Sequence, residues 1–302
     1  MHQPQPPIES SAALWAPLRH FIATERRVGA WASQRRDTAF AYEFIRFGMK
    51  QAWACLFGGA MVALIVGTHL LYPRGLALTR YDFMLIAALG IQAAMLGFKL
   101  ETWEEAKVIL IYHVVGTVME VFKTSVGSWI YPEPSFFHIG GVPLFSGFMY
   151  ASIRSYIARC WRLFAFRFDR HPPMWAVYAL AAAIYLNFYL HHYAFDARYL
   201  LFLAAAVLFG RTWLYYKVWR DWRRMPLLLG LFLAALFVWI AENLGTITKT
   251  WLYPHQMTGW SAVSLGKLGS WFLLLLISYA PVATVNRPRQ VGLNPSAARA
   301  SG

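Results

Sequence analysis

Eight long apolar segments are the feature of this sequence that most constrains its fold. A helix needs about 20 mostly apolar residues to cross a bilayer. Every backbone polar group must be satisfied inside lipid, so such segments are expected to be helices. The sequence therefore predicts an all-α, polytopic membrane protein with transmembrane helices at residues 52–72, 82–100, 106–123, 141–159, 174–193, 199–216, 226–245 and 261–284.

The composition argues against a soluble protein with a polar surface. Apolar residues make up 58% of the 302 residues and charged residues only 14%, whereas an ordinary soluble domain carries about 25% charged residues. A net charge of +14 would suggest nucleic-acid binding in a soluble protein. Here the basic residues form short clusters between the apolar segments, which is the membrane pattern. We therefore expect the lipid bilayer, and no nucleic acid, as the partner.

The distribution of lysine and arginine predicts the orientation in the membrane, because cytoplasmic loops carry an excess of both. With the N-terminus inside, 20 basic residues fall on the cytoplasmic side and five on the outer side, before Lys99 and Lys107 at the flanks of an inner loop are added. The inner residues lie in residues 1–50 and after the fourth, sixth and eighth segments. We expect a multi-pass protein of the bacterial cytoplasmic (inner) membrane with both termini in the cytoplasm.

An internal repeat divides the chain into two halves. Residues 120–132 (E-V-F-K-T-S-V-G-S-W-I-Y-P) and 242–254 (E-N-L-G-T-I-T-K-T-W-L-Y-P) share Glu, Thr, Trp, Tyr and Pro at one offset of 122. Four helices per half is an even number, which predicts two parallel four-helix repeats related by a pseudo-two-fold axis along the membrane normal. The predicted parts are a cytoplasmic amphipathic segment at 1–50, the first repeat at 51–160, a basic linker at 161–172, the second repeat at 173–286 and a disordered tail at 287–302.

Two acids at equivalent repeat positions, Glu120 and Glu242, are the main candidates for catalysis. An acid inside an apolar helix is unfavourable, so it is functional or paired with another group. Two such carboxyls can share a proton or divide the roles of acid and base. His69 and His191 are also equivalent, lie at the same predicted depth and can form proton-transfer pairs with the acids. The alternative is that each acid caps a loop or pairs with a cation.

The sequence predicts no metal site and no organic cofactor. Two histidines and two glutamates can bind a metal, but the spacings of known zinc motifs are absent. Phosphate-binding loops, nucleophile elbows and dinucleotide fingerprints are absent too. Cys55 and Cys160 lie in or beside separate apolar segments, and they fit neither a disulfide framework nor a metal-ligand spacing.

Further residues are predicted to line a substrate site between the halves. His113 lies two helical turns before Glu120 on roughly the same face. Lys267 places a charge in the eighth segment, and a salt bridge to Glu242 is its simplest partner. The repeated aromatic residues fit either an interfacial belt or a shaped turn over a cavity. The predicted substrate-binding residues, for each of which a purely structural role is the alternative, are His113, Thr124, Trp129, Tyr131, Asn243, Thr246, Trp251, Tyr253 and Lys267.

Two resemblances bear on function. Residues 119–132, then 140–150 (G-G-V-P-L-F-S-G-F-M-Y), with 241–246 and 265–271, resemble the YoaT-like family of bacterial integral membrane proteins over about residues 40–285. That family is of unknown function, so the resemblance implies no mechanism. Met119, Glu120, Gly127 and Tyr131, followed by Gly-Val-Pro-Leu, are similar to the carotenoid-hydratase (CruF-like) family. This second resemblance implies proton-initiated chemistry on an isoprenoid double bond, with Glu120, and Glu242 by internal symmetry, as acids.

Three kinds of function remain open at this point. An intramembrane enzyme would use Glu120 and Glu242 as acid and base on a lipid or isoprenoid, with no organic cofactor. A proton-coupled transporter or small-molecule carrier would use the same acids together with Lys267. A non-catalytic role in lipid binding or assembly is the third. A mass change in a lipid would favour the enzyme, and substrate-linked proton flux would favour transport.

Overall fold

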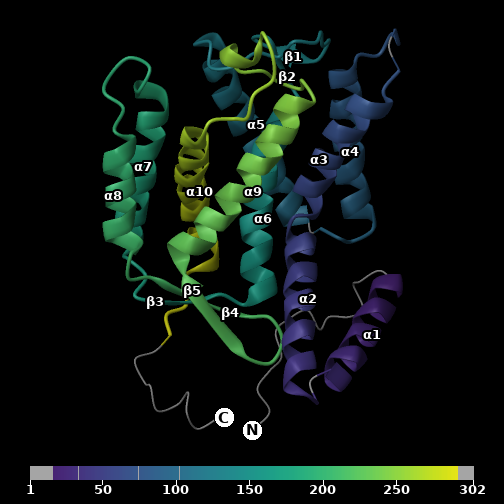
Figure 1. Ribbon diagram of the computed structural model, residues 1–302, viewed down its shortest axis with the longest axis vertical. Helices are drawn as coiled ribbons and strands as arrows, with labels where there is room; N and C mark the ends of the chain where they lie inside the picture. Colours follow the sequence, from purple (N-terminus) through teal and green to yellow (C-terminus); the bar gives the residue numbers. More distant parts are fainter. Residues whose placement is uncertain (1–15, 33, 74, 102, 292–302) are drawn as a thin grey trace. The chain divides into compact units, whose positions relative to one another are not determined.

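The computed structural model describes residues 16–32, 34–73, 75–101 and 103–291 (Figure 1). These residues form two compact units, which are described separately. The first runs up to Leu163 and also includes Phe237–Lys267, and the second contains Phe164–Leu236 and the chain from Leu268 onward. Residues 1–15 of the predicted amphipathic segment and residues 292–302 of the predicted disordered tail lie outside the described residues.

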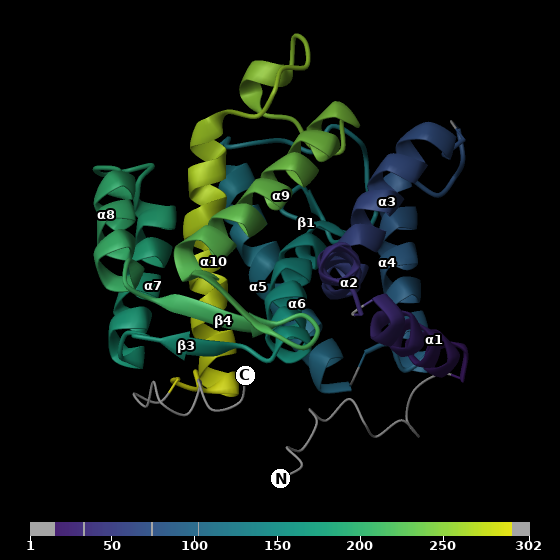
Figure 2. The same cartoon turned by 60° about the horizontal axis from the view of Figure 1, so that its bottom comes forward.

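Helices form most of the first unit. The segment predicted to be amphipathic contains two helices, and each of the next four apolar segments contains one. Helices α3 and α4 lie side by side (Figures 1 and 2). The helices are α1 (Ala16–Ala32), α2 (Arg36–Ala54), α3 (Leu56–Leu71), α4 (Arg80–Gly97), α5 (Trp103–Ser125) and α6 (Ser146–Phe164), with the later part of α9 (Leu227–Ile247), the 3-10 helix η3 (Pro254–Gln256) and the first residues of α10 (Leu265–Asn286).

The loop between α5 and α6 turns through a short hairpin. Strands β1 (His138–Ile139) and β2 (Val142–Pro143) pair antiparallel. Gly140 and Gly141 join them with φ values of 56° and 78°, a conformation that favours glycine. The buried Asp82 carboxylate, at the start of α4, accepts backbone hydrogen bonds from Phe136 and Phe137. Gly140 and Gly141 therefore turn the chain through a defined hairpin that leads into α6.

The second unit contains a sheet that the all-α prediction missed. Strands β3 (Arg167–Asp169), β4 (Trp213–Lys217) and β5 (Trp222–Pro226) form an antiparallel sheet in the order β3-β4-β5 (Figure 2). The segment 199–216, predicted as one helix, ends its helix at Phe209. Its remainder is the β4 run Trp-Leu-Tyr-Tyr-Lys, whose aromatic residues favour strand structure. Helices α7 (Met174–Leu190) and α8 (Arg198–Phe209) lie side by side in this unit.

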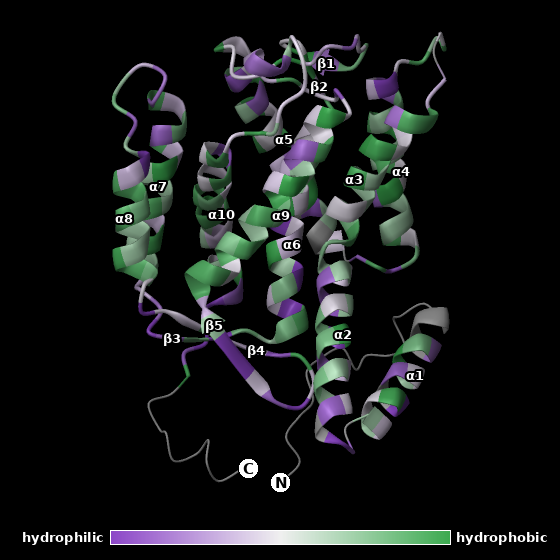
Figure 3. Cartoon of the chain, viewed as in Figure 1, coloured by the Kyte–Doolittle hydropathy of each residue, from purple (hydrophilic) through white to green (hydrophobic). Residues whose placement is uncertain are grey.

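Among the helices of the described residues, α9 and α10 are each long and apolar enough to cross a membrane. The pair α2 and α3 passes the same test together, although it is bent by 72° at the break between the two helices. Helices α7 and α8 are apolar but shorter. Apolar residues dominate α8 and α9, whereas the β4–β5 hairpin is largely hydrophilic (Figure 3). The chain is thus mostly helical with apolar helices suited to a membrane, and eight crossings in two repeats stay a prediction.

Candidate functional site

The two repeated segments meet in the first unit. The residues between Trp and Tyr in each segment, Ile130 and Leu252, exchange both backbone hydrogen bonds at 2.9 Å. The helix ends before them also match. Gly127 and Lys249, which are equivalent at the offset of 122, both have positive φ, at 72° and 53°. Locally, therefore, the two segments have the same conformation and pair with each other.

Glu120 lies in the last turns of α5 and is 5% exposed. Its Oε2 accepts hydrogen bonds of 2.7 Å from Trp129 Nε1 and from the Tyr131 hydroxyl. The Tyr150 hydroxyl, from α6, is a third donor to this carboxyl group. The tight turn after α5 brings Trp129 and Tyr131 back onto the acid, so one helix end supplies both the acceptor and two of its donors.

Glu242, on α9, repeats this arrangement in part. It is also 5% exposed, and its Oε1 accepts a hydrogen bond from the Tyr253 hydroxyl. Tyr131 and Tyr253 each follow their acid by 11 residues. The two Glu–Tyr pairs are therefore equivalent in sequence and in contact.

Lys267, at the start of α10, joins the two pairs. Its ammonium nitrogen lies 4.8 Å from the centre of the Trp129 ring and 4.6 Å from the centre of the Tyr253 ring. Those rings meet edge to face with centroids 6.0 Å apart, and the Lys267 charge also acts on Glu120. Each of these rings donates to a different acid, so Glu120, Glu242 and Lys267 belong to one cluster. We call Glu120, Trp129, Tyr131, Glu242, Tyr253 and Lys267 the acid–lysine cluster.

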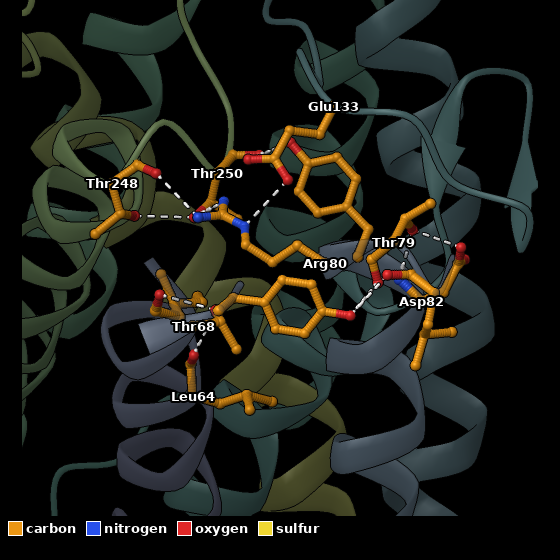
Figure 4. A network of polar contacts seen from close by, with 12 residues as sticks. Leu64, Thr68, Thr79, Arg80, Asp82, Glu133, Thr248 and Thr250 are labelled. Carbon is orange, nitrogen blue, oxygen red and sulfur yellow. Dashed lines mark hydrogen bonds and ion pairs between the residues drawn. The ribbon is translucent and has the colours of Figure 1, made fainter. Parts of the chain in front are cut away.

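A second polar network holds the turn after α9 (Figure 4). The buried Arg80 guanidinium donates to the Thr248 carbonyl at 3.4 Å and to Thr250 Oγ1 at 3.1 Å, and it lies 3.2 Å from Glu133 Oε2. The Tyr81 hydroxyl donates to the Thr250 carbonyl at 2.7 Å. Burial raises the pKa of Glu133 although the Arg80 charge opposes this. This network fixes the backbone immediately before Trp251 and Tyr253.

The predicted histidines take different places. His69, near the end of α3, is exposed, and its charge acts on Glu133. His191 belongs to the second unit, where its Nδ1 lies 2.8 Å from the Asn187 carbonyl. His113, on α5, packs its ring 4.2 Å from that of Phe148. The proton-transfer roles of these histidines stay predictions.

The remaining predicted residues surround the cluster mainly through backbone contacts. Asn243 donates to the Trp239 carbonyl and accepts from the Val263 amide. Thr246 donates to the Asn243 carbonyl and accepts from Trp260 Nε1. Trp251 is buried in the apolar core of the first unit. The Thr124 hydroxyl is buried and has no hydrogen-bond partner among the described residues.

Tyr150 and Arg80 are two residues near the acids that sequence spacing does not assign to the site. Tyr150 lies inside the Gly-Phe-Met-Tyr stretch that supports the family resemblance, but nothing in its spacing links it to Glu120. Arg80 stands just before the second apolar segment, where a basic residue fits an ordinary flanking charge. Among the residues that the structure describes, no three His, Cys, Asp or Glu side chains gather in a way that could hold a metal ion.

Comparison with known proteins decides the family. Residues 43–279 match the family described as "Protein of unknown function (DUF817)". The chain is also 42% identical over 248 residues to "Uncharacterized protein YoaT" of Bacillus subtilis (strain 168). The aligned region covers 82% of this chain and 93% of that relative. The chain belongs to the DUF817 family. No solved structure matches it.

Membership of the DUF817 family confirms the YoaT-like resemblance over most of the chain. The matched residues 43–279 contain the whole acid–lysine cluster. The description of the family names no activity, so the geometry of this cluster is the basis for a functional proposal.

Proposed function

We propose that this DUF817 member is a multi-pass inner-membrane enzyme that uses Glu120 and Glu242 for acid–base chemistry on a lipid or isoprenoid. The observation that carries the proposal is that one lysine lies over two rings, Trp129 and Tyr253, that donate hydrogen bonds to Glu120 and Glu242 respectively. A carboxyl group buried in an apolar helix bundle is unfavourable unless it is paired or has a function. We therefore expect the two acids, Glu120 and Glu242, to do chemistry.

Charge balance supports the presence of one exchangeable proton. Two carboxylates and one ammonium carry a net charge of −1, and a buried cluster of low dielectric favours neutrality. One proton held between Glu120 and Glu242 achieves that neutrality. Tyr131 and Tyr253 donate to the acids and can orient the carboxyl oxygens toward a substrate.

The proposed reaction is acid-initiated addition of water to a carbon–carbon double bond. One carboxylic acid gives its proton to one carbon, water attacks the other, and the second carboxylate takes the proton that the added water releases. Transfer of that proton between the carboxyls restores the starting state, so water and alkene give an alcohol with no cofactor. Aromatic rings can stabilise a cation, and the rings of Tyr131 and Trp129 beside Glu120 are proposed to do so for the cationic intermediate.

Lipid mass spectrometry tests the proposal. Membranes from an isoprenoid-producing host that expresses the wild type are compared with Glu120→Gln, Glu242→Gln and the control Asp221→Asn, which replaces an exposed acid between β4 and β5. We expect a product with the mass of added water in the wild type and the control, and its loss in both cluster variants. An unchanged lipid profile in a host shown to supply diverse isoprenoids would refute the enzyme proposal.

Proton-coupled transport is the second candidate. The lysine between two acids and the 72° break between α2 and α3 favour it, because interrupted helices and intramembrane charges are common in transporters. In proteoliposomes with a pH-sensitive dye, transport predicts proton flux that Glu120→Gln abolishes while lipid composition stays unchanged. Absence of that flux in wild-type vesicles would remove this candidate.

The proposal places both termini on the cytoplasmic side. Its support is the excess of lysine and arginine in the segments assigned to that side. Reporter fusions at each end test it: both should show fluorescence of a cytoplasmic reporter and no activity of a periplasmic one. A terminus with the opposite result would overturn the assigned orientation.

A further inference from the structure

Arg154, on α6, is a buried cation with unused hydrogen-bond donors. It is 6% exposed, and its guanidinium carbon lies 3.4 Å from the centre of the Tyr112 ring on α5. Within the part of the chain that the structure describes, its Nε and Nη2 are buried and have no hydrogen-bond partner. Stacking on Tyr112 therefore holds the guanidinium plane while one of its edges stays unsatisfied.

The other fully or nearly buried arginines of this unit are compensated by acids. Arg80 lies 3.2 Å from Glu133, and Arg159 lies 3.1 Å from Glu101. No acid pairs with Arg154 among the described residues. A buried charge is unfavourable unless an opposite charge accompanies it. Arg154 thus differs from its neighbours in needing a negative charge from outside the described chain.

The geometry of the two open donors indicates which kind of anion would supply that negative charge. Nε–H and one N–H of Nη2 point the same way from the guanidinium edge, and their separation matches two oxygens of a phosphate group. Arg154 also lies toward the end of the apolar segment 141–159 that precedes the basic cluster with Arg159 and Arg162. In the predicted orientation this is the cytoplasmic headgroup level, where anionic lipids are enriched.

We propose that Arg154 binds the phosphate group of an anionic membrane lipid. The site uses no residue of the acid–lysine cluster, and it depends on the predicted membrane orientation but not on the proposed reaction. Glu120→Gln is therefore expected to bind the lipid as the wild type does. A variant that loses the lipid product but still binds the lipid affects only the proposed reaction. A variant that loses lipid binding but still forms the product affects only the proposed Arg154 site. The two proposals can therefore fail separately.

Binding to the purified full-length protein in detergent tests the site. The probes are phosphatidic acid, diacylglycerol with the same acyl chains, and inorganic phosphate. The variants are Arg154→Met, which removes the charge, and Arg154→Lys, which keeps the charge but loses the paired donors. Arg162→Gln, an exposed arginine later on the same helix, is the matched control for general electrostatic attraction.

Phosphatidic acid should bind the wild type and Arg162→Gln equally, and it should bind Arg154→Met roughly tenfold or more weakly, with Arg154→Lys in between. Without lipid, Arg154→Met should melt at the same temperature as the wild type or higher, because it loses an uncompensated buried charge. If that variant does not fold, Arg154→Lys decides the result. Unchanged binding after loss of the paired donors would overturn the site. Equal stabilisation by inorganic phosphate, or by diacylglycerol, would overturn the lipid-phosphate assignment.

Discussion

Replacement of Gly147 by alanine tests how closely α5 and α6 must pack to form the site. A Cβ atom at position 147 would lie 2.4 Å from the His113 carbonyl oxygen and 2.5 Å from Thr117 Oγ1. The first of these atoms belongs to the backbone of α5, so no side-chain rotation relieves the contact. Tyr150 and Glu120 meet across the same pair of helices. The substitution should therefore disturb both the stability of the helix pair and the surroundings of Glu120.

The size of the effect follows from these distances. Favourable contacts between heavy atoms lie near 3.5–4.0 Å, so relief at Gly147 requires a local separation of roughly 1 Å. Overpacking of this kind costs about 1–3 kcal/mol. Alanine in place of glycine returns at most about 1 kcal/mol in a helix, and less in a first turn. We expect a net loss of about 1–2 kcal/mol in the free energy of unfolding.

Thermal unfolding in detergent, followed by circular dichroism, measures this difference at ~2–4 °C per kcal/mol. Gly90→Ala, on α4, is the control, because its Cβ would meet no atom within 4 Å and should leave the protein as stable or more stable. Gly269→Ala occupies the equivalent repeat position. Its closest neighbour is Phe202 Cζ at 2.7 Å, the end of a side chain that can move, so we expect a smaller loss. Equal melting temperatures for Gly147→Ala and Gly90→Ala would refute the close α5–α6 packing.

Two further predictions concern buried charges and protonation. Burial lowers the pKa of His171, whose Nδ1–H donates to Pro172 and whose Nε2 accepts from Tyr279, so the unfolded chain binds the proton more readily. The free energy of unfolding should therefore fall as pH drops below about 6.5, by at most ~1.4 kcal/mol per pH unit. In pH-dependent melting curves, His171→Gln should flatten this slope. An unchanged slope would contradict the role of His171 in the pH dependence. Glu101→Gln should lower the free energy of unfolding by about 3–5 kcal/mol, because it leaves Arg159 buried without its acid. The double replacement Glu101→Leu with Arg159→Met should lower it by less. A double-mutant cycle with additive losses would argue against the pair.

Sequence periodicity and apolarity predicted where helices occur but not where each one ends. Each of the eight apolar segments contains a helix, yet α8 stops at Phe209 while its segment continues to residue 216. Trp213–Tyr216 of β4 are aromatic or aliphatic like the residues of the helix before them, so a count of such residues does not show where the helix ends. Only the partner strands β3 and β5 distinguish the strand from the helix, and these lie in segments expected to be basic linkers.

The repeat places Glu120 and Glu242 at equivalent positions, and in the first unit the rings that donate to them, Trp129 and Tyr253, meet edge to face. Spacing alone did not predict all the contacts of Lys267. A charge in an apolar helix suggested an acid as its partner; the Lys267 charge does act on Glu120, and its ammonium also lies over the rings of Trp129 and Tyr253. Such cation–ring contacts depend on how a turn folds back, which spacing does not encode.

The lysine also explains why two equivalent acids need not have the same role. The offset of 122 pairs Lys267 with Phe145, an apolar residue in the first half, so the cluster has one ammonium for two carboxyls. Trp129, Tyr131 and Tyr150 donate to Glu120. Under the proposed function, the proton shared by the two acids lies beside a lysine that has no counterpart in the first half, so we expect the two acids to differ as proton donors.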